Sequence, residues 1–334
     1  MITQTEKIRQ TPTWQKELAL CINNIDELLS IIGLDASRLE ISKTAEKQFS
    51  LKIPAGYVYR IKKSDPQDPL LRQILPVMDE TIVTCGYVND PVNDSASTVA
   101  QGLLKKYDGR VLLLATAACA IHCRYCFRRH FPYADATART DWLDTLEYLR
   151  CHADIHELIL SGGDPLTLSD TRLSGLVEEI AAIPHITTLR IHSRLPVVLP
   201  ERVCEELLMW VQKTRLKVVF VIHCNHAQEI DSLVGQALQN LAASGVTLLN
   251  QSVLLKGVND SADALVSLSQ KLFKYGVLPY YLHTLDPVSG AAHFDVDDNN
   301  ARQLVSDLQA RLPGYLVPRL VREMAGKPSK IPVI

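Results

Sequence analysis

Residues 111–130 read VLLLATAACAIHCRYCFRRH. The first six are a short apolar run typical of a buried strand, and Cys119, Cys123 and Cys126 follow it within eight residues. Three thiolates on one short loop can converge on a single inorganic centre, either an iron–sulfur cluster or zinc. Structural zinc normally takes a fourth protein ligand, for which His122 or His130 is available, whereas three cysteines leave one metal position open to a small molecule.

Short apolar runs alternate with amphipathic stretches from this segment to the C-terminal region. The predicted strands are 111–116, 157–162, 187–193, 217–223, 246–253 and 278–283. The predicted helices lie near 141–151, 170–183, 201–213, 227–244 and 262–275. This alternation is typical of βα units with parallel strands. Six strands favour an α/β fold with a partial (β/α)6 TIM-like barrel, and a doubly wound sheet is the alternative.

Polar residues follow each predicted strand, where parallel folds of this kind bind ligands. After the second strand, the sequence SGGDPL contains Ser161, Gly162, Gly163 and Asp164; the glycines permit close backbone approach, and the aspartate can accept from a cationic group. Alternatively, the two glycines form only a structural turn that connects the strand to the following helix. The later loops carry HSRLP, HCNH, NQ and HTLD.

Composition indicates a globular protein without a nucleic-acid partner. The chain has 334 residues, of which 47% are hydrophobic, and its 35 basic and 37 acidic side chains leave a formal charge of −2 with no long basic run. The N-terminus lacks an apolar segment, and the longest apolar stretch, 111–121, is too short to span a bilayer. We expect no membrane association, reduced cysteines and a cytoplasmic location.

The region before the first predicted strand has a different texture. TWQKELALCI at 13–22 and NIDELLSIIG at 24–33 have helical periodicity, with Asp26 near a helix start, and irregular sequence follows them. We expect residues 1–97 to be a mostly helical N-terminal region, 98–290 the barrel core, and 291–334 a C-terminal segment.

CAIHCRYC resembles the cluster loop of the radical S-adenosylmethionine superfamily, which implies a 4Fe-4S cluster and S-adenosylmethionine at Cys119, Cys123 and Cys126. Over residues 65–334 the resemblance narrows to the lysine 2,3-aminomutase family. The matching strings are CRYCFRRHF, SGGDPL, RIHSRLPVVLP, LLNQSVLLKGVND, LDPVSGAAHF, GYLVP and SKIPV.

This resemblance implies the site residues. Lys330 is the covalent anchor of pyridoxal phosphate, with Lys327 as its rival. The other implied cofactor residues are Tyr107 and Arg110 for pyridoxal phosphate, and Ser161, Gly162, Gly163, Asp164, His223 and Gln251 for S-adenosylmethionine. Arg128 is implied to bind the substrate carboxylate, and Asp286 and Glu323 its distal ammonium. For KKYDGR, which contains Tyr107 and Arg110, the alternative is a solvated helix end.

The chain also departs from the family pattern. The glycines before the anchoring lysine are partly lost, and His283 stands where the family usually has an aromatic residue below the cofactor ring. Ser261 replaces a zinc-site cysteine, and the sequence ends at Ile334 without the zinc-binding extension of catabolic members, so we expect no zinc.

The implied activity moves the α-amino group of free L-lysine to the β carbon. In lacking the zinc ligands, the chain resembles members that make (R)-β-lysine for attachment to translation elongation factor P. This resemblance implies a lysyl ligase as a functional partner and a reductant such as flavodoxin. A catabolic or osmolyte-producing aminomutase acting on lysine or glutamate is a second possibility. A non-enzymatic iron–sulfur redox sensor is the third.

Overall fold

The protein's structure is a computed structural model that describes residues 13–132 and 142–334. In this part of the chain, ten strands form one sheet in sequence order. Seven consecutive strands are parallel: β3 Arg110–Thr116, β4 Glu157–Gly162, β5 Thr188–Ser193, β6 Lys217–His223, β7 Thr247–Val253, β8 Leu278–His283 and β9 Arg319–Arg322. The six predicted strands are therefore confirmed. β9 was missed because RLVR is too short to give a periodic signal.

A helix follows each of the first six parallel strands. These helices are α7 Leu143–Cys151, α8 Asp170–Ala181, α10 Glu205–Lys213, α11 Ser232–Ala243, α12 Ala262–Lys274 and α13 Asp298–Arg311, with the short α9 Leu195–Val198 just after β5. α8 shows why they pack as they do: it buries Leu173, Leu176, Val177 and Ile180, which share one helical face.

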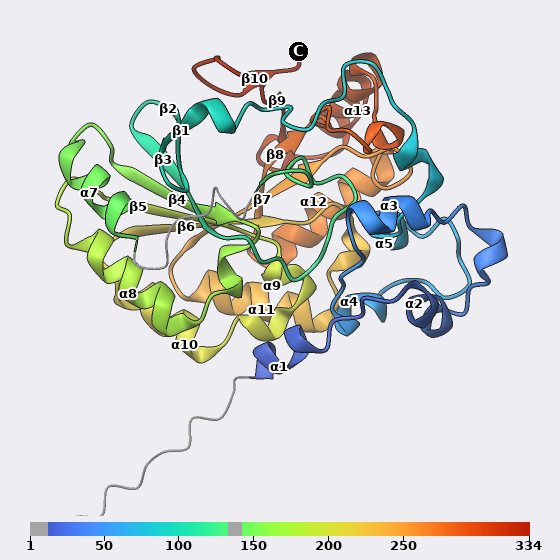
Figure 1. The fold of residues 1–334 in the computed structure, drawn as a ribbon, viewed down its shortest axis with the longest axis horizontal. Helices are drawn as coiled ribbons and strands as arrows, with labels where there is room; N and C mark the ends of the chain where they lie inside the picture. The colour runs from blue at the N-terminus through green and yellow to red at the C-terminus, as the bar shows by residue number, and fades with distance from the viewer. Residues whose placement is uncertain (1–12, 133–141) are drawn as a thin grey trace, which may run out of the picture.

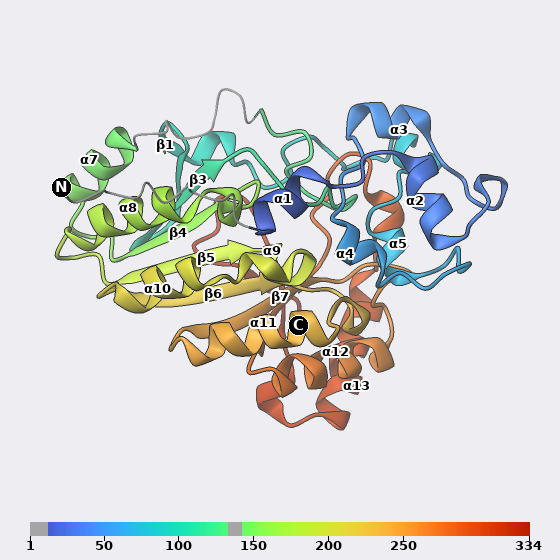
Figure 2. The same cartoon turned by 90° about the horizontal axis from the view of Figure 1, so that it is seen from below.

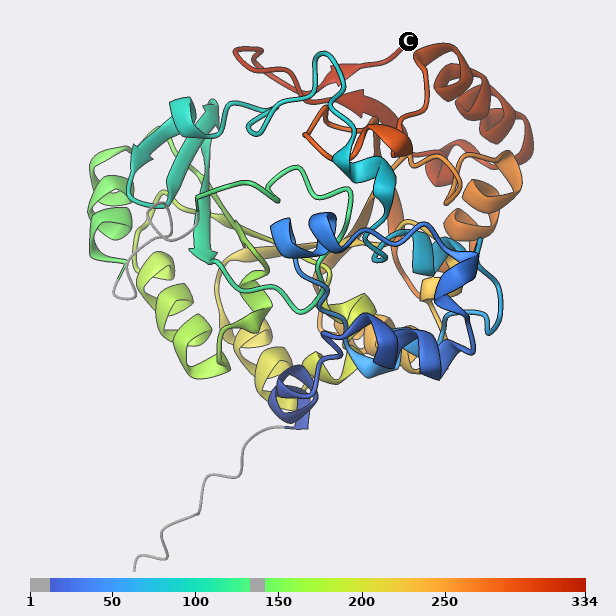
Figure 3. The same ribbon diagram turned by 45° about the vertical axis from the view of Figure 1, so that its right-hand side comes forward.

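The sheet curves, and the helices that join its strands cover its outer side (Figures 1 and 2). A doubly wound sheet would place such helices on both faces. The predicted α/β fold class, a partial (β/α)6 barrel, is therefore confirmed, and a view turned by 45° shows the same curvature (Figure 3).

The barrel is open between its two edges. β1 Thr98–Ala100 and β2 Leu103–Tyr107 extend one edge as antiparallel strands, and β10 Ile331–Pro332 pairs antiparallel with β9 at the other. Within the described residues, β1 and β10 are the two ends of the strand order, and both edges lie at the top of Figure 1.

The basic stretch KKYDGR forms a β-hairpin, so its alternative interpretation as a helix end is wrong. Lys105–Tyr107 end β2, Arg110 begins β3, and Gly109 makes the turn with φ +72°. A Cβ on Gly109 would also lie 2.2 Å from the His156 ring, so the turn requires glycine.

In residues 13–97, short helices alternate with longer irregular stretches. The helices are α1 Thr13–Ala19, α2 Ile25–Ile32, α3 Lys43–Gln48, α4 Ala55–Val58 and α5 Pro69–Arg72. Asn24 caps α2 by accepting from the N–H groups of Asp26 and Glu27, so Asp26 does lie in the first turn.

One continuous hydrophobic core joins these helices to the barrel, since Trp14 and Leu28 belong to the same buried cluster as Leu113 and Leu160. A second cluster, which includes Leu282, Leu308 and Leu320, joins the C-terminal segment to β8. The division at residues 97 and 290 stays a prediction, and residues 1–12 of its first part lie outside the described residues. No helix of the described chain is both long and apolar enough to cross a membrane.

Candidate active site

The predicted site residues gather at two places along the C-terminal ends of the parallel strands. The cysteine loop follows β3. Ser161–Asp164 lie at the C-terminal end of the neighbouring strand β4. Asp286 follows β8, and Glu323 and Lys330 lie between β9 and β10. The side chains of His223 on β6, Gln251 on β7 and His283 on β8 lie at the strand ends between them.

The cysteine loop holds three free thiols, each partly buried. They are close enough to influence one another: burial and the neighbouring Cys126 raise the pKa of Cys119, and burial and Cys123 raise the pKa of Cys126 to about 11. In the described residues, no group of three or more His, Cys, Asp or Glu side chains is arranged to hold a metal ion. The assignment of these cysteines to a cluster therefore stays a prediction.

The two histidines considered as zinc ligands each have a ring nitrogen within hydrogen-bond distance of a backbone carbonyl oxygen. His122 Nδ1 lies 2.8 Å from the carbonyl oxygen of Ser50, and its ring stacks on Phe49. His130 Nε2 lies 3.0 Å from the carbonyl oxygen of Ser289. These contacts give no support to zinc ligation by either ring.

The N-terminal region clamps the cysteine loop through buried charges that sequence analysis missed. Glu80 accepts from Arg124 Nε at 2.8 Å and Nη2 at 2.5 Å, and from Arg129 Nη2 at 2.6 Å. The Glu80 and Arg124 side chains are 0% exposed. One carboxylate neutralises only one of the two guanidiniums. Arg129 is close enough to Cys126 to act toward a lower pKa of that thiol, so its positive charge complements an anionic cluster.

Arg194 is a second cation at the thiols that the sequence did not reveal. Its Nη1 donates to Cys123 Sγ at 2.6 Å, and its Nη2 donates to Glu229 at 3.0 Å and to Gln73 at 2.8 Å. Arg194 lies in the HSRLP loop, but a single arginine after a strand does not reveal what it contacts.

The SGGDPL turn packs against the cysteine loop. A Cβ on Gly162 would lie 2.3 Å from the carbonyl oxygen of Thr116, and one on Gly163 would lie 2.4 Å from that of Ala118. The close approach is therefore to the backbone after β3, and only glycine allows it. Whether this turn also holds a ligand stays a prediction.

Asp164 fastens the neighbouring loop. Its carboxylate accepts from Ser193 Oγ at 2.8 Å and from the backbone N–H of Arg194 at 2.8 Å, and burial raises its pKa to about 6. These contacts orient the segment that carries the Arg194 guanidinium.

Three imidazoles lie at the strand ends. Gln251 Nε2 donates to His223 Nε2 at 2.7 Å, and burial, together with Arg194 and Arg128, lowers the pKa of His223 to about 3. His192 Nε2 and His283 Nε2 are buried without a hydrogen-bond partner. Burial lowers the pKa of both rings, with further lowering by nearby positive charge that includes Lys330. Unpaired buried nitrogens in a native site indicate positions that a ligand can satisfy.

Arg128 is fixed at the mouth of the cysteine loop. Its Nε donates to Asp94 at 2.7 Å and its Nη1 donates to Ser161 Oγ at 3.3 Å. Asp94 is 1% exposed and also pairs with Lys106 Nζ at 2.6 Å. The arginine therefore has a set orientation, and Asp94, which lies in irregular sequence, could not be identified from any pattern.

The two candidate anchoring lysines differ in their surroundings. Lys330 is half-buried, its Nζ lies 2.5 Å from Glu323 Oε2, and it sits over the Tyr281 ring at 5.9 Å. Lys327 is exposed. The geometry favours Lys330 as the residue directed into the site.

Tyr107 and Arg110 reach the same end of the site. Tyr107 Oη donates to Glu323 Oε1 at 2.7 Å, and the Arg110 guanidinium lies 4.6 Å from the centre of the Tyr107 ring. Tyr107 is thus joined to a residue predicted to bind substrate. Its predicted contact with pyridoxal phosphate stays untested.

Asp286 completes this end. Burial, with Glu323 and Asp94 nearby, raises its pKa to about 7, while Lys330 and Lys106 act in the opposite direction. A cationic ligand beside this carboxyl group would favour its ionised form, so the position suits an ammonium group.

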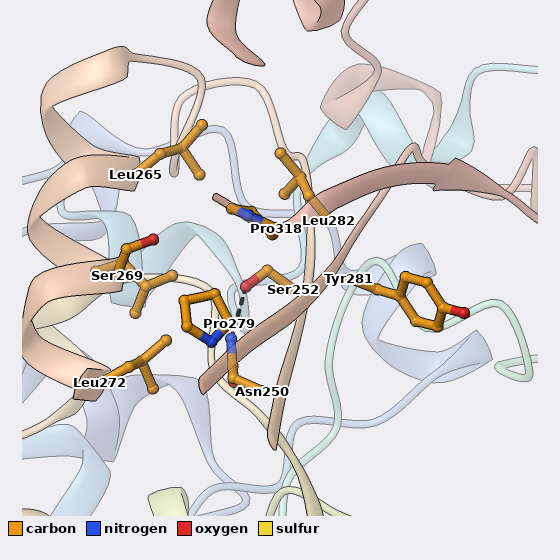
Figure 4. A pocket seen from close by; sticks show the side chains of 10 residues that line it. Asn250, Ser252, Leu265, Ser269, Leu272, Pro279, Tyr281, Leu282 and Pro318 are labelled. Atoms are coloured by element: carbon orange, nitrogen blue, oxygen red, sulfur yellow. Dashed lines mark hydrogen bonds between the residues drawn. The ribbon is translucent and has the colours of Figure 1, made fainter. Parts of the chain in front are cut away.

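Two cavities lie elsewhere, on the outer side of the sheet. One of about 10 Å³ lies between α12 and strands β7 and β8, where Asn250 donates to Ser252 at 2.9 Å (Figure 4). It has room for about one water molecule. A depression of about 290 Å³ lies between α8 and α10 near Trp210. No predicted site residue lines either cavity.

The donor sets fit the groups that the resemblance implies. Three thiols with the buried cations Arg194 and Arg129 nearby suit an anionic iron–sulfur cluster. A half-buried primary amine, the nearby Arg110 and two unpaired imidazole nitrogens suit pyridoxal phosphate. Fold and site together define an enzyme of the partial α/β-barrel class.

Sequence comparison identifies the family. The chain is 48% identical to the L-lysine 2,3-aminomutase of Escherichia coli over 322 residues, which cover 96% of this chain and 94% of that protein. It is 44% identical to that of Haemophilus influenzae, with 99% and 98% covered, and 34% identical to that of Clostridium subterminale, with 96% and 77% covered. The chain belongs to the L-lysine 2,3-aminomutase family, as predicted. No family model matches it.

Solved structures give weaker likenesses. SuiB of Streptococcus suis bound to S-adenosylmethionine has a TM-score of 0.49 and 14% identity, with 68% of this chain and 52% of that chain covered. anSMEcpe with bound AdoMet has a TM-score of 0.45 and 12% identity, with 59% and 57% covered.

Proposed function

We propose that this protein is an L-lysine 2,3-aminomutase that moves the α-amino group of free L-lysine to the β carbon. The observation that carries the proposal is the joining, in one barrel mouth, of a three-thiol loop to an amine–carboxylate cluster formed by Lys330, Glu323 and Asp286. The family membership supports the same reaction.

The proposed cofactors are a 4Fe-4S cluster on Cys119, Cys123 and Cys126, S-adenosylmethionine near His223, Gln251 and the SGGDPL turn, and pyridoxal phosphate on Lys330. Bound there, the cluster and S-adenosylmethionine supply the radical that removes a β hydrogen, and pyridoxal phosphate supplies the conjugated ring that assists nitrogen migration. His223 is neutral above its lowered pKa of about 3, so it accepts a hydrogen bond without adding charge to the site.

Arg128 binds the α-carboxylate of the substrate. Asp94 fixes its Nε edge at 2.7 Å, so the guanidinium is oriented before the substrate arrives. A planar guanidinium suits a carboxylate because it donates two parallel hydrogen bonds.

Asp286 and Glu323 bind the distal ammonium. Their negative charges are compensated by a substrate that carries a cation at its far end, whereas glutamate would place a third carboxylate beside them. Unpaired or repelling buried charges cost several kcal/mol, so this end discriminates strongly against acidic substrates.

We further propose that the product is (R)-β-lysine, used in the cytoplasm for attachment to elongation factor P by a lysyl ligase, with a flavodoxin-type protein as reductant. In support, position 261 lacks the cysteine that zinc-binding members of the family have there. Ser261, at the position of the family's zinc-site cysteine, caps α12 here by accepting from the Ala264 N–H at 3.3 Å.

The test is an anaerobic assay of the reconstituted protein with L-lysine, followed by mass spectrometry of the products. Formation of β-lysine is expected; β-glutamate from glutamate would overturn the substrate assignment, and cluster oxidation without turnover would favour the redox sensor. The pathway is tested separately by the mass of elongation factor P from cells lacking this protein. An unchanged β-lysyl adduct would remove the translation role.

A further inference from the structure

The carboxylate of Glu323 joins the two edges of the open barrel. Glu323 lies just after β9, at the C-terminal edge of the sheet, whereas Tyr107 and Lys106 belong to β2 at the opposite edge. Tyr107 Oη donates to Glu323 Oε1 at 2.7 Å, and Lys106 Nζ lies 3.7 Å from the same oxygen. Side chains therefore bridge the gap that the strands leave open.

The two oxygens of this carboxylate have different partners. Oε1 faces the fixed groups of β2, while Oε2 pairs with Lys330 Nζ at 2.5 Å. Lys330 lies on the segment that leads into the short β10, and its flexible side chain can withdraw from the carboxylate without breaking the bridge at Oε1.

We propose that Glu323 Oε2 is an ammonium exchange position, occupied by Lys330 in the cofactor-free protein and by the distal ammonium of the substrate once Lys330 has been drawn away. The inference rests on the proposed function, because it takes Lys330 as the anchor of pyridoxal phosphate. Lysine binding is thereby made conditional on cofactor loading, and Tyr107 is a positioning residue that keeps Oε2 directed into the site.

Simultaneous occupation is unfavourable on charge grounds. Two ammonium groups on one oxygen would lie in contact in a half-buried position that already contains Lys106. Departure of Lys330 removes one cation from a cluster that retains Asp286, Glu323 and Asp94, and an arriving ammonium restores the balance.

The magnitude follows from competition. If Lys330 occupies Oε2 in 90 to 99% of molecules, as roughly expected for a close intramolecular pair, the apparent affinity for a competing ammonium falls about 10- to 100-fold. Removing the Lys330 ammonium should restore that affinity.

The experiment measures L-lysine binding calorimetrically to the full chain with pyridoxal phosphate withheld. Lys330→Met, which keeps most of the side-chain volume without the charge, should bind L-lysine at least about 10-fold more tightly than the wild type. Lys327→Met is the matched control and should bind as the wild type does, because Lys327 is exposed. L-norleucine, which lacks the distal ammonium, should show no gain with Lys330→Met.

Adding Glu323→Gln to Lys330→Met should abolish the gain, and adding Tyr107→Phe should reduce it. If Lys330→Met does not fold, Lys330→Gln removes the same charge. An unchanged L-lysine affinity, or an equal gain for L-norleucine, overturns the exchange but leaves the proposed reaction standing. Pyridoxal phosphate found covalently on Lys327 overturns the exchange and reassigns the anchor.

Discussion

Glu80 and Arg124 form a two-point ion pair, with contacts of 2.8 and 2.5 Å, in which both side chains are 0% exposed. The pair links the N-terminal region to the residue directly after Cys123. The arginine also donates to the carbonyl oxygen of Ala45 at 3.2 Å, so the cysteine loop is held from two sides of that region.

Glu80→Gln should lower the free energy of unfolding by roughly 3 to 5 kcal/mol, because it leaves Arg124 and Arg129 buried without their counter-charge. Urea denaturation measures this. Glu179→Gln breaks the exposed pair with Arg150, whose side chains are 53% and 59% exposed, and is the control; it should change stability by less than about 0.5 kcal/mol. Equal changes in the free energy of unfolding for the two substitutions would show that the buried ion pair stabilises the protein no more than an exposed one.

Cys123→Ala should abolish assembly of an oxygen-labile iron–sulfur cluster, because it removes one of three thiolates and the acceptor of the Arg194 hydrogen bond. Iron and sulfide analysis after anaerobic reconstitution measures the loss. Cys151→Ala, at an exposed cysteine outside the loop, is the matched control. A full cluster in the Cys123 variant, or zinc in the wild-type protein, would contradict the assignment.

Borohydride reduction of the protein loaded with pyridoxal phosphate should mark Lys330 and leave Lys327 unmodified. Lys330 is directed into the site toward Glu323 and Tyr281, whereas Lys327 is exposed. Peptide mapping by mass spectrometry reads the position of the adduct. Lys330→Met should eliminate the adduct and Lys327→Met should retain it; the reverse pattern would reassign the anchor.

Asp286→Asn should raise KM for L-lysine at least about 10-fold while leaving cluster content and cofactor absorbance unchanged, because only the distal ammonium loses its partner. The wild-type KM should fall as pH rises through about 7, where Asp286 ionises, and this fall should be absent in the variant. A pH-independent wild-type KM between pH 6 and 8 would argue against this role.

The raised pKa of Asp286 also makes the free energy of unfolding depend on pH. Ionisation of Asp286 favours substrate binding but destabilises the folded protein. The pKa of Asp286 is raised from 3.8 to about 7, so the folded protein binds more protons than the unfolded chain between these values, and Asp286 increasingly destabilises the fold as pH rises through that window. Asp286→Asn should therefore be more stable than the wild type at pH 8 by roughly 4 kcal/mol, with the difference vanishing near pH 4. A constant difference across this range would show that the pKa is not raised.

The repeating part of the fold was predictable from local patterns. Apolar runs such as 217–223 and amphipathic stretches such as 262–275 contain their own period, and their alternation implies parallel strands joined by helices. β9, β1 and β2 escaped prediction because short edge strands are defined by the partners with which they pair.

By itself, the sequence determined the α/β class, the position of the three cysteines on a loop after a strand, and the family resemblance that marks Lys330, because each depends on residues close together in the chain. Only the tertiary structure decided that Asp94 orients Arg128, that Arg194 reaches Cys123, and that Tyr107 and Lys330 share Glu323. Arg194 and Cys123 are 71 residues apart, and Tyr107 and Glu323 are 216 apart. Such contacts exist only because the curved sheet brings the ends of distant strands together at the mouth of the barrel. The local periodicity of the sequence contains no information about these long-range contacts.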